Sequence, residues 1–384
     1  MLSLWEEKRM SELQRTIEHQ QMLLKQKMEI INIKIEDLGY NALNIYDVIN
    51  TIATLLEKIC NFPLEERNKY KDVIKNIYKW KLQADKLQEN YENIVKCDDR
   101  IKEGNEINRI ATSISPSAAM GATTVFGVAS TGTATTLLSG TAVNTALAWL
   151  GGRAFANGAM AVGDVLLDVA GPIGMMLFPG WTLAGGGLIF IKSLLDKKKY
   201  EQVVELIGDR DIRQYNLVIL EIKERIGELK EECSILDKAI SNIMDMGTDY
   251  TLLSEMERYE LASYFNVMES SLQLLVEPIL GLQEKYTEKD YNKFMCYIYK
   301  SPKLGFFRTN KDALIVLANM LYGIDITKDE IKVLYKVLRS NNVFLRSIGY
   351  DKYEFDIGMI YAAVIMADYS YNNKGEKIVP LDKF

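Results

Sequence analysis

Residues 212–243 read IRQYNLVILEIKERIGELKEECSILDKAISNI, and this stretch decides the fold. Alternating steps of four and three residues land on an apolar side chain at all ten positions, as the a and d positions of a heptad repeat do. The ten positions are Ile212, Tyr215, Ile219, Ile222, Ile226, Leu229, Cys233, Leu236, Ile240 and Ile243. The pattern predicts a long amphipathic helix over residues 211–246 with one apolar seam.

Two further segments repeat this pattern. The same steps meet apolar side chains at thirteen of fifteen positions in residues 4–60 and at nine of ten in residues 64–108. The sequence NFP at 61–63 should end the first helix, because the residue before a proline is pushed out of helical geometry. The first seam comprises Met10, Gln14, Ile17, Gln21, Leu24, Met28, Ile31, Ile35, Leu38, Ala42, Ile45, Ile49, Ile52, Leu56 and Ile59, and the second Tyr70, Val73, Ile77, Trp80, Ala84, Leu87, Tyr91, Ile94, Asp98 and Ile101.

These lengths predict an all-α fold. At 1.5 Å per residue the helices would be roughly 50–80 Å long, which exceeds the diameter of a compact domain, so they must pack side by side. We therefore expect an elongated bundle of long coiled-coil-like helices, with an inserted Gly/Ala-rich apolar segment and a C-terminal helical domain. The expected domains are long antiparallel helices at 1–109, a membrane-insertion segment at 110–192, a returning helix at 193–248 and a compact helical domain at 249–384.

The C-terminal domain should consist of shorter helices. The pattern favours helices at about 251–285, 288–299, 312–322, 327–340 and 353–371. The sequence TKDE at 327–330 predicts a capping box, in which a Thr side chain and a Glu side chain satisfy each other's backbone N–H groups.

The segment between the second and third long helices is apolar. Residues 110–152 contain no charge over 43 positions, and residues 169–191 contain none over another 23. The second run is long enough to span a bilayer, and Lys192 and the lysines at 197–199 follow it as a basic flank. Prolines and glycines inside this run favour a broken helix or a hairpin over one straight helix.

Three interpretations of this segment stay open. It is a permanently buried helical core, a constitutive membrane anchor, or a conditional membrane segment that is sheltered in water and inserted later. We favour the third, because a Gly- and Thr-diluted segment can remain soluble when covered. The polar residues Arg153, Asp164 and Asp168 then mark a hairpin tip. The residues expected to insert are Val125, Phe126, Leu137, Leu138, Trp149, Leu150, Met175, Met176, Leu177, Phe178, Trp181, Ile189 and Phe190.

The sequence favours no enzyme class. It lacks HExxH, GxSxG and GxxxxGK[ST], and the four cysteines form no CxxC pair, so we expect no catalytic residues, no cofactor and no metal site. We expect the thiols to be free and buried. His19, the single histidine, lies among polar residues and should be a solvated surface residue. A net charge of −6 and the lack of a basic stripe argue against nucleic acid as a partner.

We expect no signal peptide in the first residues given, because Glu6 and Glu7 precede any apolar run. We expect a soluble protein, cytoplasmic or secreted without a cleaved leader, that becomes associated with a membrane.

Residues 1–246 are predicted to contain two long amphipathic helices, an apolar interruption and a returning long helix. This layout resembles the cytolysin A and haemolysin BL group of α-helical pore-forming toxins. The resemblance implies a pore-forming toxin or effector that inserts residues 110–191 on oligomerisation. It also implies the partners, which are a lipid membrane and either further copies of the chain or related subunits of a multi-component toxin. The alternative is a non-enzymatic coiled-coil adaptor or scaffold whose apolar segment docks a protein partner.

Overall fold

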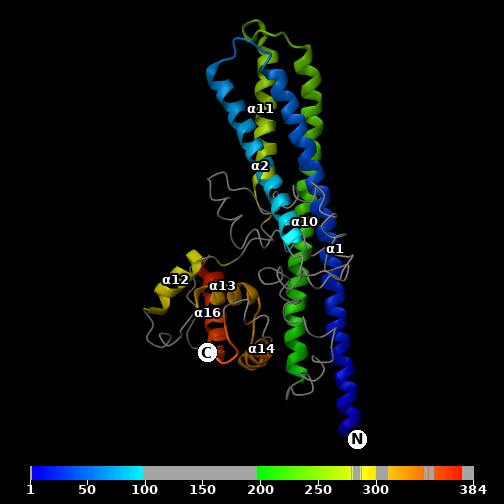
Figure 1. The fold of residues 1–384 in the computed structure, drawn as a ribbon, viewed down its shortest axis with the longest axis vertical. Coiled ribbons are helices and arrows are strands. Elements are labelled where there is room, and N and C mark those ends of the chain that lie inside the picture. Colours follow the sequence, from blue (N-terminus) through cyan, green and yellow to red (C-terminus); the bar gives the residue numbers. More distant parts are fainter. Residues whose placement is uncertain are drawn as a thin grey trace. The chain divides into compact units, whose positions relative to one another are not determined.

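The computed structural model describes residues 2–97, 197–277, 279, 286, 288–299, 310–340, 345 and 350–373. These residues form eight α-helices and one 3₁₀ helix and contain no strand, so the predicted all-α class is confirmed for the described part of the chain (Figure 1). The helices are α1 (Leu2–Leu56), α2 (Leu64–Cys97), α10 (Lys197–Asp245), η1 (Tyr250–Leu252), α11 (Glu255–Val276), α12 (Glu288–Tyr299), α13 (Lys311–Met320), α14 (Lys328–Ser340) and α16 (Ile357–Asn373).

The chain divides into two compact units, and α1 and α10 each contribute to both. Within the described residues, the bundle unit contains residues 28–97 and 215–279. The C-terminal unit contains residues 2–27, 197–214 and 286–373. The predicted C-terminal domain began at 249, whereas α11 belongs to the bundle unit, where it packs against α2.

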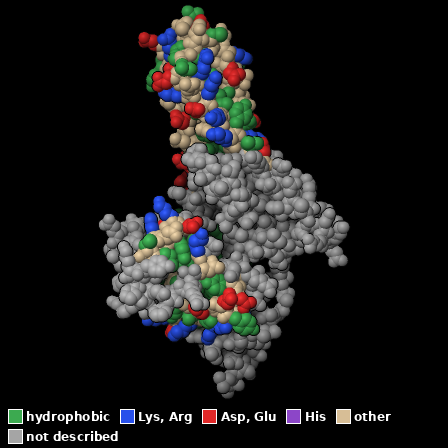
Figure 2. All heavy atoms as spheres, turned by 60° about the vertical axis from the view of Figure 1, so that its left-hand side comes forward, with side chains coloured by type: hydrophobic (Ala, Val, Ile, Leu, Met, Phe, Trp, Pro, Cys, Tyr) green, Lys and Arg blue, Asp and Glu red, His purple; other side chains and the backbone are tan. Residues whose placement is uncertain are grey.

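The apolar seams form the core of the bundle unit. All eight seam positions of α1 from Ile31 to Leu56 are buried, as is Ile59 in the turn that follows, and so are Tyr70, Val73, Ile77 and Trp80 of α2. Along α10, seven of the ten seam positions are buried, and Ile212, Cys233 and Ile240 are half-buried. The opposite helix faces carry charge, and Figure 2 shows acidic and basic side chains intermingled over this unit. The intrinsic helix propensity of these residues would not by itself stabilise the long helices. Burial of their apolar stripes against one another supplies the stability.

The helices of the bundle unit form two antiparallel pairs. In the α1–α2 pair, the Tyr78 hydroxyl donates to Asn50 Oδ1 at 2.6 Å. In the α10–α11 pair, the Asn242 side chain donates to the Tyr264 hydroxyl at 2.7 Å. The helices α1 and α10 run parallel to each other (Figure 1).

The two hairpin turns are joined at one end of the bundle unit. The Cys60 N–H donates to the Thr248 carbonyl at 2.7 Å, and the Tyr250 N–H donates to the Cys60 carbonyl at 3.0 Å. Helix α1 ends at Leu56, four residues before the predicted end at Cys60. The N–H groups of Lys58 and Ile59 then bond to carbonyls three residues earlier, and Asn61 adopts a φ of 56°. Asparagine tolerates this left-handed conformation, which reverses the chain ahead of the proline.

An aromatic cluster fills the space behind the joined turns. The ring of Phe62 contacts the rings of Tyr70, Tyr250 and Phe265, with centroid distances of 5.7, 4.7 and 6.0 Å. Burial, together with the hydrogen bond that the hydroxyl donates to Glu66, raises the pKa of Tyr250 to about 12. The cluster therefore contains side chains from both turns and from the two helices that follow them, α2 and α11.

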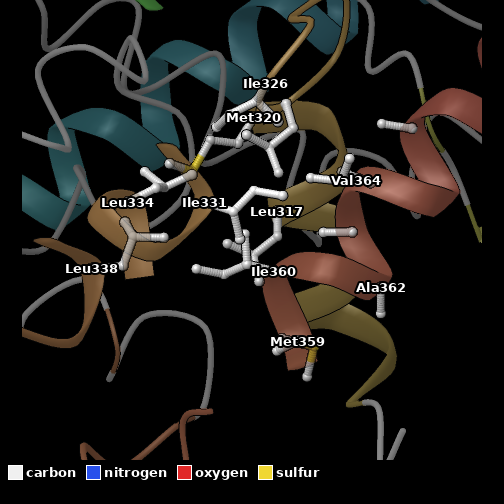
Figure 3. Packing of buried hydrophobic residues seen from close by; sticks show 14 of the residues in the cluster. Leu317, Met320, Ile326, Ile331, Leu334, Leu338, Met359, Ile360, Ala362 and Val364 are labelled. Atoms are coloured by element: carbon white, nitrogen blue, oxygen red, sulfur yellow. The ribbon is translucent and has the colours of Figure 1, made fainter. Parts of the chain in front are cut away.

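The short helices of the C-terminal unit lie close to their predicted positions. Helix α12 has the predicted bounds, while α13, α14 and α16 start or end within four residues of theirs. Their apolar faces converge on one core, in which Leu317 of α13, Ile331 and Leu334 of α14 and Ile360 of α16 are fully buried (Figure 3). This unit therefore has its own hydrophobic core.

Candidate functional site

The residues predicted to insert into a membrane lie outside the described residues. This holds for the whole segment 110–191 and for the predicted hairpin tip at Arg153, Asp164 and Asp168. It also holds for Val125, Phe126, Leu137, Leu138, Trp149, Leu150, Met175, Met176, Leu177, Phe178, Trp181, Ile189 and Phe190. The structure instead shows the end of α2, where this part of the chain begins, and the start of α10, where it ends.

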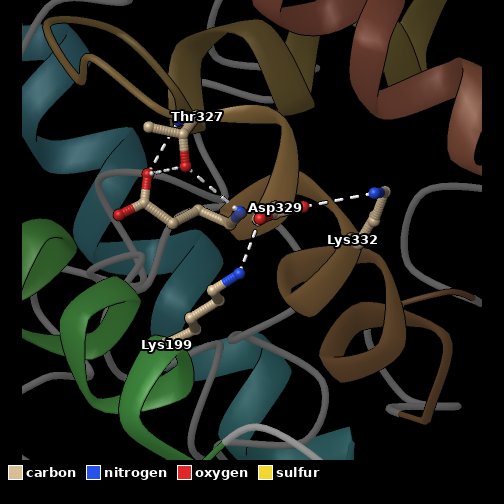
Figure 4. Close-up of polar contacts among 5 residues, drawn as sticks. Lys199, Thr327, Asp329 and Lys332 are labelled. Atoms are coloured by element: carbon tan, nitrogen blue, oxygen red, sulfur yellow. Dashed lines mark hydrogen bonds and ion pairs between the residues drawn. The ribbon is translucent and has the colours of Figure 1, made fainter.

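The first turn of α10 is tied to α14 by an ion pair. Lys199 Nζ lies 2.6 Å from Asp329 Oδ2, and Lys332 Nζ lies 3.2 Å from Asp329 Oδ1 (Figure 4). The predicted capping box is present next to it. The Thr327 N–H donates to Glu330 Oε2 at 2.7 Å, and the Glu330 N–H donates to Thr327 Oγ1 at 3.4 Å. The capping box fixes the first turn of α14, which carries the Asp329 carboxylate to Lys199.

The Asp329 ion pair predicts a dependence of stability on pH. Hydrogen bonds from Lys199 and Lys332 hold the pKa of Asp329 below its ordinary value of 3.8. The pair should therefore stabilise the unit fully above pH 3.8, and this stability should be lost as the pH falls through the lowered pKa. In thermal unfolding over a pH series, the difference in melting temperature between the wild type and Asp329→Asn should shrink as the pH falls below 3.8.

The exposed Glu354 of the same unit supplies the control for this prediction. The difference in melting temperature between the wild type and Glu354→Gln should not shrink in the same way over the pH series. A difference between the wild type and Asp329→Asn that stays constant over the pH series would contradict the role given to the ion pair.

A buried guanidinium joins α10 to the end of α13. Arg210 Nε donates to Asp211 Oδ1 at 2.7 Å, and the two side chains are only 7% and 6% exposed. Arg210 Nη2 donates to the Met320 carbonyl at 2.9 Å, and Nη1 donates to the Tyr322 carbonyl at 2.8 Å. The last carbonyls of a helix have no partner within it, so this one side chain supplies donors that α13 needs.

Polar contacts also set the register between α1 and α10 in the C-terminal unit. The Thr16 hydroxyl donates to Glu201 Oε1 at 3.1 Å, and Gln20 Nε2 donates to Asp209 Oδ1 at 3.2 Å. The buried Gln20 lies against Gly208, where an added Cβ would meet Gln20 Oε1 at 2.6 Å. A Cβ at 208 would displace the Gln20 side chain that donates to Asp209, so the glycine leaves room for this contact between the two helices.

An acidic row runs along the same face of α10. Burial, with the nearby charges of Glu201 and Asp209, raises the pKa of Glu205 above its ordinary value. Because Glu201 and Asp209 each accept a hydrogen bond from α1, the row belongs to the contact between α1 and α10. Among the described residues no group of three or more His, Cys, Asp or Glu side chains has the arrangement to hold a metal ion.

These polar contacts were missed by the sequence analysis. The predicted seam contains Gln21, whose side chain lies outside the described residues, and does not contain Gln20, which is buried. The heptad pattern starts at residue 211, whereas the helix begins at Lys197, inside the returning helix predicted at 193–248. The sequence GDRD at 208–211 was the available signal, since a glycine between charged residues interrupts an otherwise regular amphipathic helix.

Two expectations about reactive side chains have different outcomes. His19 is exposed on α1, as predicted. The prediction of buried thiols is wrong for Cys60 and Cys296, which are free and exposed, while Cys233 is free and half-buried. Cys60 is exposed because it lies in the turn after α1, and the contacts of this turn are made by its backbone.

Among the residues that the structure describes, none of the helices combines the length and the apolar character needed to cross a bilayer. Comparisons with protein-family models, with curated proteins and with solved structures gave no match for this chain.

Proposed function

We propose that this chain is a membrane-permeabilising, pore-forming protein, a toxin or an effector, that shelters residues 110–191 in its soluble form. It inserts them when it assembles with further copies of itself or with related subunits. The observation that carries the proposal is the uncharged run of 23 residues at 169–191, followed by Lys192 and the lysines at 197–199. This combination of length and basic flank is typical of a segment that enters a bilayer.

The described helices support this division of roles. The seams of α1, α2 and α10 are already buried against one another in the bundle unit, and the outward faces of these helices carry mixed charge. The proposal therefore assigns insertion to residues 110–191 and assigns support to the long helices, in an elongated arrangement. The segment gains about 25 cal/mol for each Å² of apolar surface that it buries in lipid. Its backbone must be fully hydrogen-bonded there, which favours a helical hairpin.

Release of a dye from lipid vesicles tests the proposal. We expect purified protein to release the dye and the double variant Leu177→Lys/Phe178→Lys to lose this activity. Each lysine at the bilayer centre costs about 2.5–3.5 kcal/mol, so release should fall by a factor of about 100 or more. The matched control is Leu252→Lys in the bundle unit, whose side chain is 83% exposed and which should leave release unchanged.

Deletion of residues 118–191 gives a second test, with retained helicity as the check that the variant folds. Release by the full chain and none by the deletion variant supports the proposal. Sealed vesicles at every lipid composition and pH, together with stable binding of one protein partner through the apolar segment, would favour the adaptor instead.

A further inference from the structure

Two acceptor groups on facing helices of the C-terminal unit receive no hydrogen bond from the described residues. Oxygen Oε1 of Gln20 on α1 is buried without a partner, in a side chain that is only 7% exposed. The Glu205 carboxylate on α10 accepts no hydrogen bond from another described residue. An amide oxygen and an ionised carboxylate are both acceptors, so neither group satisfies the other at neutral pH. A buried acceptor that lacks a donor destabilises the fold.

The close contact of α1 with Gly208 brings these two groups near each other. An added Cβ at Gly208 would lie 2.6 Å from Gln20 Oε1, so this oxygen occupies the space that a side chain at 208 would fill. Glu205 precedes Gly208 by three residues. Residues three apart on a helix share a face, with their Cβ atoms about 5–6 Å apart. The Gln20 oxygen therefore lies within reach of the Glu205 side chain.

The acidic neighbours of Glu205 on this face of α10 already have donors from α1. Glu201 accepts from the Thr16 hydroxyl at 3.1 Å, and Asp209 accepts from Gln20 Nε2 at 3.2 Å. Glu205 lies between them along the row and is the member without a donor among the described residues. Burial, and then the negative charges of Glu201 and Asp209, raise the pKa of Glu205 above its ordinary value of 4.5.

The basic groups around this contact do not neutralise the row. Lys199 pairs with Asp329 of α14, and Arg210 pairs with Asp211. The side chain of Glu18 on α1 lies outside the described residues. The other charged or titratable groups nearby are exposed and form no ion pair with another described residue; they are Glu12, Arg15 and His19 of α1 and Arg213 of α10.

We propose that Glu205 is a proton switch in the contact between α1 and α10. Its protonated carboxyl group donates a hydrogen bond to Gln20 Oε1, and deprotonation removes this bond. One proton thereby supplies the donor that both groups lack, and it also removes the repulsion between Glu205 and its two acidic neighbours. The first part of α1 is therefore held more tightly on α10 in acid than at neutral pH.

The raised pKa of Glu205 gives the direction of this pH dependence. A carboxyl group whose pKa is raised in the folded state contributes its stability fully below the pKa of the unfolded state. The contribution is lost as the pH rises through the raised value. The contact between α1 and α10 is thus tightest below pH 4.5. This direction is opposite to that of Asp329, whose pKa is lowered.

Hydrogen exchange of the full-length protein tests the switch at the amides of residues 12–27. Glu205→Gln is uncharged and carries a permanent donor, so at pH 7 these amides should exchange about fivefold more slowly than in the wild type. The difference should disappear below pH 4.5, where the wild type carries the proton. The control Glu354→Gln neutralises an exposed carboxylate of the same unit and should match the wild type at every pH.

A second substitution at the same position separates the hydrogen bond from the relief of charge repulsion. Glu205→Met is uncharged and of similar length, but it has no donor for Gln20 Oε1. Its exchange at pH 7 should stay within about twofold of the wild type. Equal slowing by Glu205→Gln and Glu205→Met would assign the effect to repulsion alone and overturn the inference. Unchanged exchange in Glu205→Gln at pH 7 would overturn it as well.

Discussion

Replacing Arg210 by alanine should lower the free energy of unfolding of the C-terminal unit by about 3–5 kcal/mol. The guanidinium is 7% exposed and bonds three groups at once: the Asp211 carboxylate and the carbonyls of Met320 and Tyr322. The variant removes all three bonds and leaves the buried Asp211 charge without its guanidinium partner. Leaving a buried charge or carbonyl without its partner costs far more than the net value of the bond itself. Denaturant unfolding followed by circular dichroism measures the loss.

Two further variants separate this contact from a general effect of removing charge. Arg213→Ala removes an exposed arginine of the same helix and should change the free energy by no more than about 0.5 kcal/mol. Arg210→Lys keeps the charge, but one ammonium group lacks the planar fork that reaches a carboxylate and two carbonyls together, so its stability should lie between those of wild type and alanine. If Arg210→Ala and Arg213→Ala were equally mild, Arg210 would not be the joint between α10 and α13.

Replacing Phe62 by alanine should destabilise the bundle unit by about 3–5 kcal/mol, because it opens a cavity among packed rings. Phe62 is 6% exposed and contacts Tyr70 from α2, Tyr250 from the second turn and Phe265 from α11. The same change should loosen the joined turns. Hydrogen exchange should therefore become faster at the N–H groups of Cys60 and Tyr250, which bond across the two turns.

Controls for Phe62 come from the same end of the bundle unit. Phe62→Leu retains most of the volume and should cost less than about 1.5 kcal/mol. Tyr259→Ala removes a ring that is 74% exposed and should cost no more than about 0.5 kcal/mol. A Phe62→Ala variant with unchanged exchange at both amides would show that the aromatic cluster does not hold the turns together.

The heptad spacing predicted which faces of the long helices are buried. From Ile31 to Leu56 every seam position of α1 is buried, because a stripe with this period can leave water only by packing against similar stripes. The capping box at Thr327 and Glu330 was equally predictable, since it depends on residues three apart. Local chemistry fixes such features without knowledge of the rest of the chain.

The sequence predicts the composition of the candidate membrane-insertion segment but not the contacts between the helices on either side of it. The uncharged run at 169–191 is visible in the sequence, but nothing local indicates that Gln20 of α1 lies against Asp209 of α10. That contact depends on the register between α1 and α10, whose contacts join residues 185 to 189 positions apart in the chain. A seam specifies that a helix face is buried and leaves open which partner covers it.

The sequence by itself determined the helical class, the buried seams and the positions of most short helices, because periodicity and capping act over a few residues. The tertiary structure decided the parallel course of α1 and α10, the division into two units and the placement of α11 against α2. It also brought Arg210 to the end of α13 and Phe62 to Tyr250, across 110 and 188 residues of chain respectively. Contacts over such separations are selected by the combined packing of several helices, and no single stretch of sequence encodes them.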